Sequence, residues 1–398
     1  MSRLRTIGWV LLFSITMWGQ ELSVAEYNAQ HGFNDTINRQ APDFIKVGLV
    51  VAEPGEVLYT VLGHAALHLR CPAFDLDYVY SVESENVPRK VMKFLFNHLR
   101  MGTMMMSLEE YLRPYREEGR GVTEYPLNLP PEVKMELWRI CDEMVEKGDY
   151  AAYDPVKRGC AVSIVHRIDE AINAANRQNG TQYRIDYTSW GDSGKRTIRE
   201  IFYQNATKGW GLFWCMTIVA GRYVDDPHIP LREKMISPAE VKERWLNATI
   251  DGQPLIAGEP VVLVPSESEA KAEVFSPLWF SLLILVLAFA CLWLKSSLLD
   301  YVLLTMYVVF AFLITYLVVM PLPNTDWNWL VIPFNILPVL CWHWRRYWAL
   351  PYAGIILLWC IAMSVAFLMG TILVGWSHIL LALSFAILLL KQRFAVRR

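Results

Sequence analysis

The chain has 398 residues, of which 37 are Lys or Arg, 39 are Asp or Glu and 54% are apolar. Only nine of the 76 charged side chains lie after residue 274, and this asymmetry excludes a single, uniform water-soluble fold. The aromatic content of 13% and the net charge near zero exclude a largely disordered chain.

The first residues have the pattern of a secretory signal. Arg3 and Arg5 precede an uncharged stretch from residue 6 to 18, which is shorter than the roughly 17–25 residues of a membrane span. We therefore predict that residues 1–20 form a signal peptide. An uncleaved N-terminal anchor is the alternative, because residues 19–21 (Gly-Gln-Glu) make a poor cleavage site.

Residues 21–274 form the domain that we expect to be exported. They carry 28 basic and 37 acidic side chains, so the surface should be mildly acidic and nucleic acid is excluded as a partner. The sequence has neither a Gly-rich phosphate loop nor a paired Cys-x-x-Cys signature, so we expect no cofactor and no metal. Four scattered cysteines do not make a disulfide framework, and pairing among them is left open.

Hydrophobic patterning in this domain predicts an α+β fold. The predicted elements are strands over residues 44–51, 57–70 and 74–82, helices over 90–100, 107–116 and 132–147, and a helix that begins near Cys160. The helix over 132–147 is the clearest, because Pro130 and Pro131 stand at its start and an apolar stripe follows.

Cys160 and His64 are the candidate catalytic residues. Cys160 follows Gly159 at the start of a predicted helix, where free N–H groups and the positive end of the helix dipole favour a thiolate. The same N–H groups could bind an oxyanion. His64 lies in the strand over 57–70, where its imidazole could take the thiol proton if the two residues meet.

Alternatives exist for each of these roles. From spacing alone, Cys160 could be an ordinary core residue. His68 is an alternative base, because alternation along a strand places it on the same face as His64. A third group that orients His64 could be Ser81 or Glu83 from the next strand, and the spacing does not choose between them.

Residues 275–398 are predicted to form a membrane domain with five transmembrane helices. The predicted spans are about 277–294, 301–320, 328–344, 348–368 and 372–390, each close to the roughly 20 residues that cross a bilayer. The third is the shortest and contains Pro333 and Pro338. If residues 21–274 are exported, every basic residue of this part lies on the cytoplasmic side, as the positive-inside rule expects, and the C-terminus is cytoplasmic.

The loop between the second and third predicted spans, residues 321–329, is polar for its position. Asn324, Asp326 and Asn328 are candidates for contact with a lipid head group or an acceptor substrate. Ordinary capping of the loop is the alternative.

Several motifs, in this order, resemble the Lnb-type periplasmic domain family, the Bacteroidota-type lipoprotein N-acyltransferases. The motifs are Gly63-His-Ala-Ala-Leu67, Asp77-Tyr-Val-Tyr80, Lys93-Phe-Leu95, Tyr115-Arg-Glu-Glu-Gly-Arg-Gly-Val122, Tyr153-Asp154 before Cys160, Thr197-Ile-Arg-Glu200, Gly221 with Asp225-Asp226, Arg232-Glu-Lys-Met235, Pro323-Asn-Thr-Asp-Trp-Asn328 and Asn335-Ile-Leu-Pro338.

The resemblance implies a circularly permuted papain-like thiol domain, in which the histidine strand precedes the cysteine helix, followed by a membrane domain. It assigns the nucleophile to Cys160 and the base to His64. The chain departs from the family at two neighbours of the nucleophile, since Gly159 and Ala161 stand where Asn and Thr are usual.

The function that the resemblance implies is acyl transfer at the bacterial inner membrane, with the catalytic domain in the periplasm. A phospholipid would give an acyl chain to the cysteine, and the thioester would pass it to the α-amine of a diacylated lipoprotein. Two alternatives differ in class: a papain-like peptidoglycan amidase or endopeptidase, and a non-catalytic membrane protein that binds lipoproteins.

Overall fold

The structure is a computed structural model. It describes residues 38–39, 41–55, 60–85, 88–148, 150–154, 156–187, 196–205, 210–267, 276–294, 297–320, 322 and 324–395. The chain divides into a unit of residues 1–44 and a unit of residues 45–398, and every element named below belongs to the second. The predicted signal peptide over residues 1–20 lies outside the described residues.

An antiparallel sheet with the strand order β10-β5-β1-β2-β3-β4-β6 is the centre of the N-terminal part. Its strands are β1 (Lys46–Ala52), β2 (His64–Cys71), β3 (Leu76–Ser84), β4 (Arg100–Met106), β5 (Val122–Pro126), β6 (Ala151–Ala152) and β10 (Val261–Val264). A second small sheet has the order β7 (Ile185–Asp186), β8 (Thr249–Ile250) and β9 (Gln253–Pro254). With the helices below, this architecture confirms the α+β prediction.

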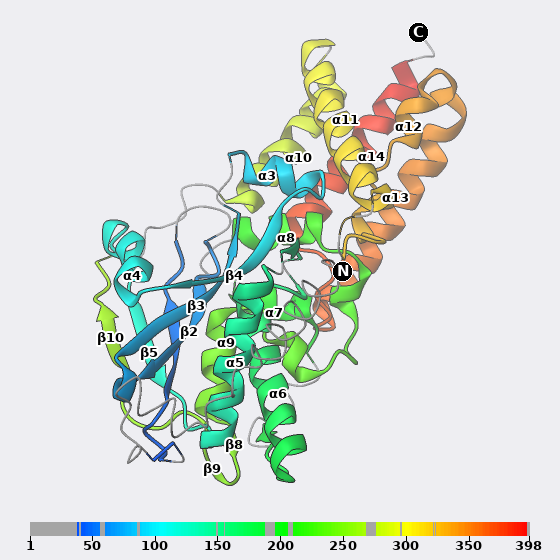
Figure 1. Cartoon of the computed structure of the whole chain (residues 1–398). Helices are drawn as coiled ribbons and strands as arrows, with labels where there is room; N and C mark the ends of the chain where they lie inside the picture. Colours follow the sequence, from blue (N-terminus) through cyan, green and yellow to red (C-terminus); the bar gives the residue numbers. More distant parts are fainter. Residues whose placement is uncertain are drawn as a thin grey trace, which may run out of the picture. The chain divides into compact units, whose positions relative to one another are not determined.

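Helices cover both faces of the large sheet. Helices α5 (Pro131–Lys147), α6 (Cys160–Asn179) and α9 (Pro238–Leu246) contact β4, β2 and β1, and Figure 1 shows them together on one side of the sheet. Helix α4 (Leu108–Glu117) lies on the other side, where Tyr111 and Leu112 form a buried cluster with Val50, Ala66 and Val79. Because side chains alternate along a strand, each strand contributes to both cores.

Two predicted elements are shorter than expected. The strand predicted over 57–70 begins only at His64 in the described residues, because Gly63, at φ +80°, turns the chain into β2. A Cβ atom at Gly63 would collide with the carbonyl oxygen of Ala52, so this glycine permits the approach of another backbone. The helix predicted over 90–100 is α3 (Lys90–Leu95), after which Asn97, at φ +55°, leads the chain into β4.

The C-terminal part contains four apolar helices, α10 (Pro277–Trp293), α11 (Ser297–Val319), α13 (Arg345–Leu368) and α14 (Trp376–Ala395). By length and composition, Leu298–Val319 and Trp342–Leu368 could cross a membrane, whereas α10 and α14 are shorter apolar helices. Large side chains face outward along them, such as Trp279, Leu298 and Leu358. An outer surface of this kind suits lipid better than water. Helices α7 (Ile198–Asn205) and α8 (Trp210–Val219) precede this part, and Trp214 of α8 packs against its core.

The prediction of five transmembrane helices needs correction at the third span. Residues 328–344 contain only the 3₁₀ turns Trp329–Val331 and Trp342–Trp344 and the short helix α12 (Leu337–Leu340). Pro333 and Pro338 interrupt helical hydrogen bonding here, because proline has no N–H group.

Side chains satisfy much of the irregular backbone in this segment. The hydroxyl of Tyr352 donates to the carbonyl oxygens of Ile332 and Pro333, at 2.8 and 3.1 Å, and that of Tyr307 donates to the carbonyl of Asn335 at 3.2 Å. Such bonds are what permit non-helical backbone at membrane depth, where no water is available.

One ion pair shows which helix ends lie together. Lys391 of α14 contacts Asp300 of α11 at 2.7 Å, and its amine donates to the carbonyl oxygen of Leu294 just after α10. At the other end of α14, His378 stacks on Trp214 of α8 with ring centroids 5.5 Å apart. The start of α14 therefore adjoins the N-terminal part, and its end adjoins the connection between α10 and α11.

Candidate active site

Cys160 is the first residue of α6 and is half-buried. Gly159 precedes the helix in an extended conformation, and the first helical hydrogen bond runs from Ser163 N–H to the carbonyl of Gly159 at 3.0 Å. The N–H groups of residues 160–162 therefore have no partner within the helix. The buried stripe of α6, which includes Ala161, Val165 and Ile168, fixes the helix against the sheet.

His64 is the first residue of β2, and its imidazole is held by two side chains of β3. The Nε2–H group donates to Ser81 Oγ at 2.7 Å, and the Ser81 hydroxyl donates to Glu83 Oε1 at 2.7 Å. Glu83 Oε1 also lies 3.1 Å from His64 Nε2. Ala66 of β2 pairs with Ser81 of β3, and the two strands are antiparallel. Two positions before Ala66 therefore lies opposite two positions after Ser81, which puts Glu83 opposite His64. Ser81 and Glu83 thus both contact the imidazole.

The structure brings Cys160 and His64 close enough for each to shift the pKa of the other. Since Nε2 is engaged by Ser81 and Glu83, Nδ1 is the ring nitrogen left for the thiol. The backbone N–H of Ala65, next to His64, also bonds the Cys160 sulfur. Helix α6 and strand β2 therefore place the pair, each with its terminal residue.

Electrostatics favours the charged forms of this pair. Burial raises the pKa of Cys160, but the positive charge of His64 and the bonds from His64 and Ala65 outweigh it and lower this pKa below the usual thiol value. Burial lowers the pKa of His64, whereas the charges of Cys160 and Glu83 raise it well above the usual value. Burial likewise opposes ionisation of Glu83, yet the charge of His64 lowers the pKa of Glu83 to about 2. The arrangement supports a thiolate, an imidazolium and a carboxylate in sequence.

Three tyrosines surround the pair. The ring of Tyr111 lies 6.4 Å from that of His64, and Tyr115 donates a hydrogen bond to the Tyr111 hydroxyl at 3.4 Å. Tyr153 interacts electrostatically with Cys160, and burial together with that negative charge raises the pKa of Tyr153 to about 12. Its phenol is therefore protonated at neutral pH. These rings border the pair, both members of which are half-buried.

The other candidate base, His68, lies in a different cluster. Its side chain is fully buried, with Nε2 2.7 Å from Asp77 Oδ1 and Nδ1 3.2 Å from Glu124 Oε1. Glu124 also accepts a hydrogen bond from Arg70 at 2.9 Å. The position of His68 is therefore explained by its own two carboxylates, four residues along β2 from His64.

The remaining cysteines of this part differ from Cys160. Cys71, Cys141 and Cys215 have free thiols, so none forms a disulfide. Burial raises the pKa of each of these three thiols, for Cys141 to about 12. Among these four cysteines, only Cys160 has a lowered pKa. Across the described residues, no group of three or more His, Cys, Asp or Glu side chains could hold a metal ion.

Asp154 connects the site to the membrane part. Its carboxylate accepts hydrogen bonds from the N–H groups of Val156 and Lys157, at 2.9 and 3.0 Å, in the turn that leads to Cys160. The side-chain amide of Asn324 donates to both carboxylate oxygens, at 2.7 and 2.8 Å. Asn324 lies between α11 and α13, so the loop of the membrane part supports the turn before Cys160.

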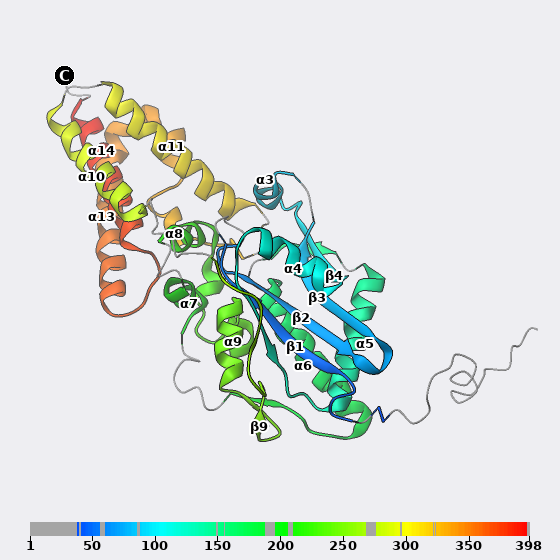
Figure 2. The same ribbon diagram turned by 90° about the vertical axis from the view of Figure 1, so that its left-hand side faces the viewer.

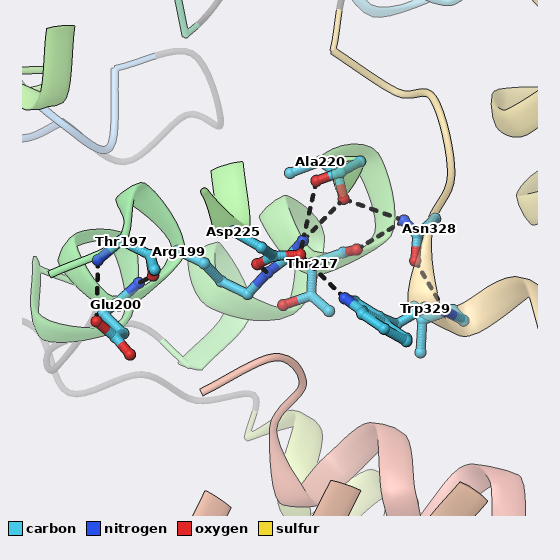
Figure 3. A network of polar contacts seen from close by, with 10 residues as sticks. Thr197, Arg199, Glu200, Thr217, Ala220, Asp225, Asn328 and Trp329 are labelled. Atoms are coloured by element: carbon cyan, nitrogen blue, oxygen red, sulfur yellow. Dashed lines mark hydrogen bonds and ion pairs between the residues drawn. The ribbon is translucent and has the colours of Figure 1, made fainter. Parts of the chain in front are cut away.

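The same loop is bound to the N-terminal part by a buried network (Figure 3). Asn328 donates to the carbonyl oxygens of Thr217, Ile218 and Ala220, and Trp329 Nε1–H donates to Asp225 at 3.0 Å. Arg199 forms a 2.6 Å ion pair with Asp225.

Backbone contacts continue this network at Gly221. Its N–H donates to the carbonyl of Asn324 at 2.6 Å, and the next N–H, that of Arg222, donates to the carbonyl of Asp326 at 3.0 Å. A Cβ atom at Gly221 would overlap Asp326, so only glycine allows this approach.

The three loop residues predicted to contact substrate therefore have different surroundings. The side chains of Asn324 and Asn328 bind groups of the protein itself, and Asn328 is buried. The side chain of Asp326 is exposed.

Sequence reasoning did not assign roles to Asp154, Arg199 or Asp225. A usable signal was present for the first, since an Asp followed by a short turn and a helix is a common capping pattern.

Part of the chain matches a known protein family. Residues 33–193 match the family model described as the Lnb N-terminal periplasmic domain, and this range includes Cys160, His64, Ser81, Glu83 and Asp154. No curated protein and no solved structure matches the chain.

Proposed function

Residues 33–193 of this chain belong to the Lnb N-terminal periplasmic domain family, and we propose that the protein is a membrane-bound lipoprotein N-acyltransferase. The observation that carries the proposal is the pairing of Cys160, at the start of α6 and with a lowered pKa, with His64 at the start of β2. The substrates are a phospholipid as acyl donor and the free α-amine of a diacylated lipoprotein as acceptor.

In the first half-reaction, the Cys160 thiolate attacks an ester carbonyl carbon of the phospholipid. The N–H groups at the start of α6 stabilise the resulting oxyanion. The ester C–O bond then breaks, and the His64 imidazolium gives its proton to the departing alkoxide, so that a lysophospholipid leaves. The acyl chain remains on Cys160 as a thioester, and His64 is neutral.

In the second half-reaction, the α-amine of the lipoprotein attacks the thioester carbonyl. Neutral His64 takes a proton from the amine, and the C–S bond breaks to release the amide and restore the thiolate and imidazolium. Glu83 and Ser81 hold the imidazole in position throughout and stabilise its charged form. The surrounding tyrosines favour the amine over water as the acceptor, because they limit the water that reaches the thioester.

The permuted papain-like character of the domain belongs to the same proposal. Strand β2 supplies the base and precedes helix α6, which supplies the nucleophile. The histidine therefore precedes the cysteine along the chain, which is the order that the family resemblance implies.

We place the catalytic domain in the periplasm and the apolar helices in the inner membrane, with the C-terminus in the cytoplasm. The Lys391–Asp300 pair supports this topology, because it puts the end of α14 at the helix ends opposite the catalytic domain. The irregular segment over residues 328–344 then makes the third of five passages, although it is not a continuous helix.

A test is the intact mass of the protein after incubation with a phospholipid of defined chain length. The proposal expects one acyl adduct on the native chain and none on Cys160→Ala. Release of the adduct by a diacylated lipopeptide, with transfer to its α-amine, completes the assignment.

A peptidoglycan amidase or endopeptidase is the second candidate, because the same pair of residues can attack a peptide carbonyl. Cleavage of cell-wall peptides without any acyl adduct would favour it. Asn324 argues for the acyltransferase, since its bonds to Asp154 connect the nucleophile to the membrane part, where a lipid donor resides.

A further inference from the structure

Helix α3 (Lys90–Leu95) lies against the end of a membrane helix. The hydroxyl of Tyr316 in α11 donates to the carbonyl of Leu95 at 2.8 Å, and the ring of Phe96 meets that of Tyr316 edge-on at 6.2 Å. Leu95 also packs against the apolar core of the C-terminal helices. Figures 1 and 2 both show α3 beside the end of α11. Since Tyr316 lies within the candidate span Leu298–Val319, this contact puts α3 at the level where that span ends.

The exposed side of α3 and the residue that follows the helix carry large apolar side chains. Val91, Met92 and Phe96 are 51%, 49% and 51% exposed, respectively. Three large apolar side chains this close together are costly in water and are typical of a helix that lies in a membrane interface.

The charge around α3 suits the same surroundings. Residues 86–108 contain four basic side chains, Arg89, Lys90, Lys93 and Arg100, and no acidic one. The exported domain as a whole is acidic, so this segment differs from its own domain. Basic residues at a bilayer surface pair with lipid phosphates, whereas acidic ones are repelled.

The opposite side of α3 reaches the candidate active site. Phe94 packs edge-on against Tyr153 with ring centroids 5.7 Å apart. Tyr153 in turn interacts with Cys160. One short helix therefore separates the surface beside α11 from the nucleophile.

We propose that α3 is an interfacial anchor that lies among phospholipids of the leaflet facing the catalytic domain, with Val91, Met92 and Phe96 between the acyl chains. A phospholipid held there, beside Phe94 and Tyr153, is the acyl donor for Cys160. This second statement rests on the proposed function, whereas the contact with phospholipid does not.

Photo-crosslinking tests the contact directly. The full chain, as Cys160→Ala so that no acyl transfer occurs, is made with benzoyl-phenylalanine at position 92 or 96 and placed in nanodiscs of phosphatidylethanolamine and phosphatidylglycerol. After irradiation, we expect an added mass of one phospholipid at both positions. Position 279 is the positive control, because Trp279 of α10 is 70% exposed, and position 135 is the negative control, because Met135 is 40% exposed on α5, which packs against α6 and β4. Lipid adducts at 279 without any at 92 and 96 would overturn the inference, as would equal labelling at 135.

A kinetic comparison tests the link to the donor. Met92→Asp should slow acylation of Cys160 by bilayer phospholipid about tenfold, because a charge replaces an apolar contact with lipid. Met135→Asp should have no effect. A short-chain phospholipid that dissolves as a monomer should acylate native protein and Met92→Asp at similar rates. Equal slowing with both donors would contradict the role of α3 in lipid contact. If the native chain is not acylated by either donor, the proposed function fails, and the crosslinking result still decides whether α3 touches lipid.

Discussion

The side-chain amide of Asn324, in the membrane part, donates hydrogen bonds to both carboxylate oxygens of Asp154, at 2.7 and 2.8 Å. Asp154 lies six residues before Cys160 and caps the intervening turn through Val156 and Lys157. The position of Cys160 therefore depends on a residue that follows it by more than 160 positions.

Asn324→Asp should remove the hydrogen bonds that support Asp154 and leave the fold of the loop intact. Asn324 has φ +57°, which Asp also tolerates, but a second carboxylate would repel Asp154. Loss of a hydrogen bond to a charged group costs about 1.5–3 kcal/mol, so we expect acyl-enzyme formation to slow about 10- to 100-fold. Single-turnover kinetics measures the rate, with Asn128→Asp, on an exposed loop, as the matched control. An unchanged rate in a variant whose unfolding temperature has fallen would show that Asn324 serves stability alone.

Cys160→Ser should abolish acyl transfer and leave the fold intact, because a serine hydroxyl in the same place is not ionised near neutral pH. Cys215→Ser, at another partly exposed thiol, should keep most of the activity. Transfer from phospholipid to a diacylated lipopeptide is the measurement, and circular dichroism checks the fold. If activity survives in Cys160→Ser and disappears in Cys215→Ser, the assignment of Cys160 as the nucleophile is wrong.

The pH dependence of alkylation tests the thiolate–imidazolium pair. Because the pKa of Cys160 is lowered and that of His64 is raised, the thiolate should persist below the usual thiol titration, and the alkylation rate should fall at a lower pH than it does for an ordinary thiol. In His64→Gln the positive charge is lost, while burial still raises the pKa of Cys160. The profile should then move to alkaline pH, with alkylation at pH 7 slower by about tenfold or more.

Transfer by His64→Gln should fall by about 10²–10⁴-fold, the usual contribution of a general base. His68→Gln tests the other histidine of the strand and should affect neither alkylation nor transfer in the fraction that folds. The reverse result would move the base to His68, and an unchanged profile in both variants would mean that Cys160 is not activated.

Glu83→Gln should move the alkaline limb of the first half-reaction. The charge of Glu83 helps to raise the pKa of His64, so its removal lets the imidazolium lose its proton at lower pH. The leaving alkoxide needs that proton, so the alkaline limb of acyl-enzyme formation should move to lower pH. Asp77→Asn, at the partner of His68, should leave the limb in place. A limb that shifts equally in both variants would argue against a specific role for Glu83.

Reporter fusions test the topology. An enzyme that is active only outside the cytoplasm should work when fused after Asp326 and fail after Arg346 or Arg398. The physical reason is the placement of basic residues on one side and the Lys391–Asp300 pair at the helix ends opposite the catalytic domain. Activity of the fusion at Arg398 would contradict the five-passage path.

The sequence by itself determined the division between a charged domain and an apolar membrane part, because composition is a local property that needs no knowledge of contacts. It also predicted the start of α6 at Cys160 and most of the strands, since caps and alternation act over a few residues. The tertiary structure decided the rest.

His64 and His68 share one face of β2. Only His64 lies at the end of the strand that meets the start of α6, so only its imidazole reaches the thiol of Cys160. Ser81 and Glu83 were equivalent candidates until the pairing of β2 with β3 put both at His64. Hydropathy predicted a helix over residues 328–344, because it counts apolar side chains and not the hydrogen bonds that proline removes. The bonds between Asn324 and Asp154 join segments 170 residues apart, and no local pattern encodes such a contact.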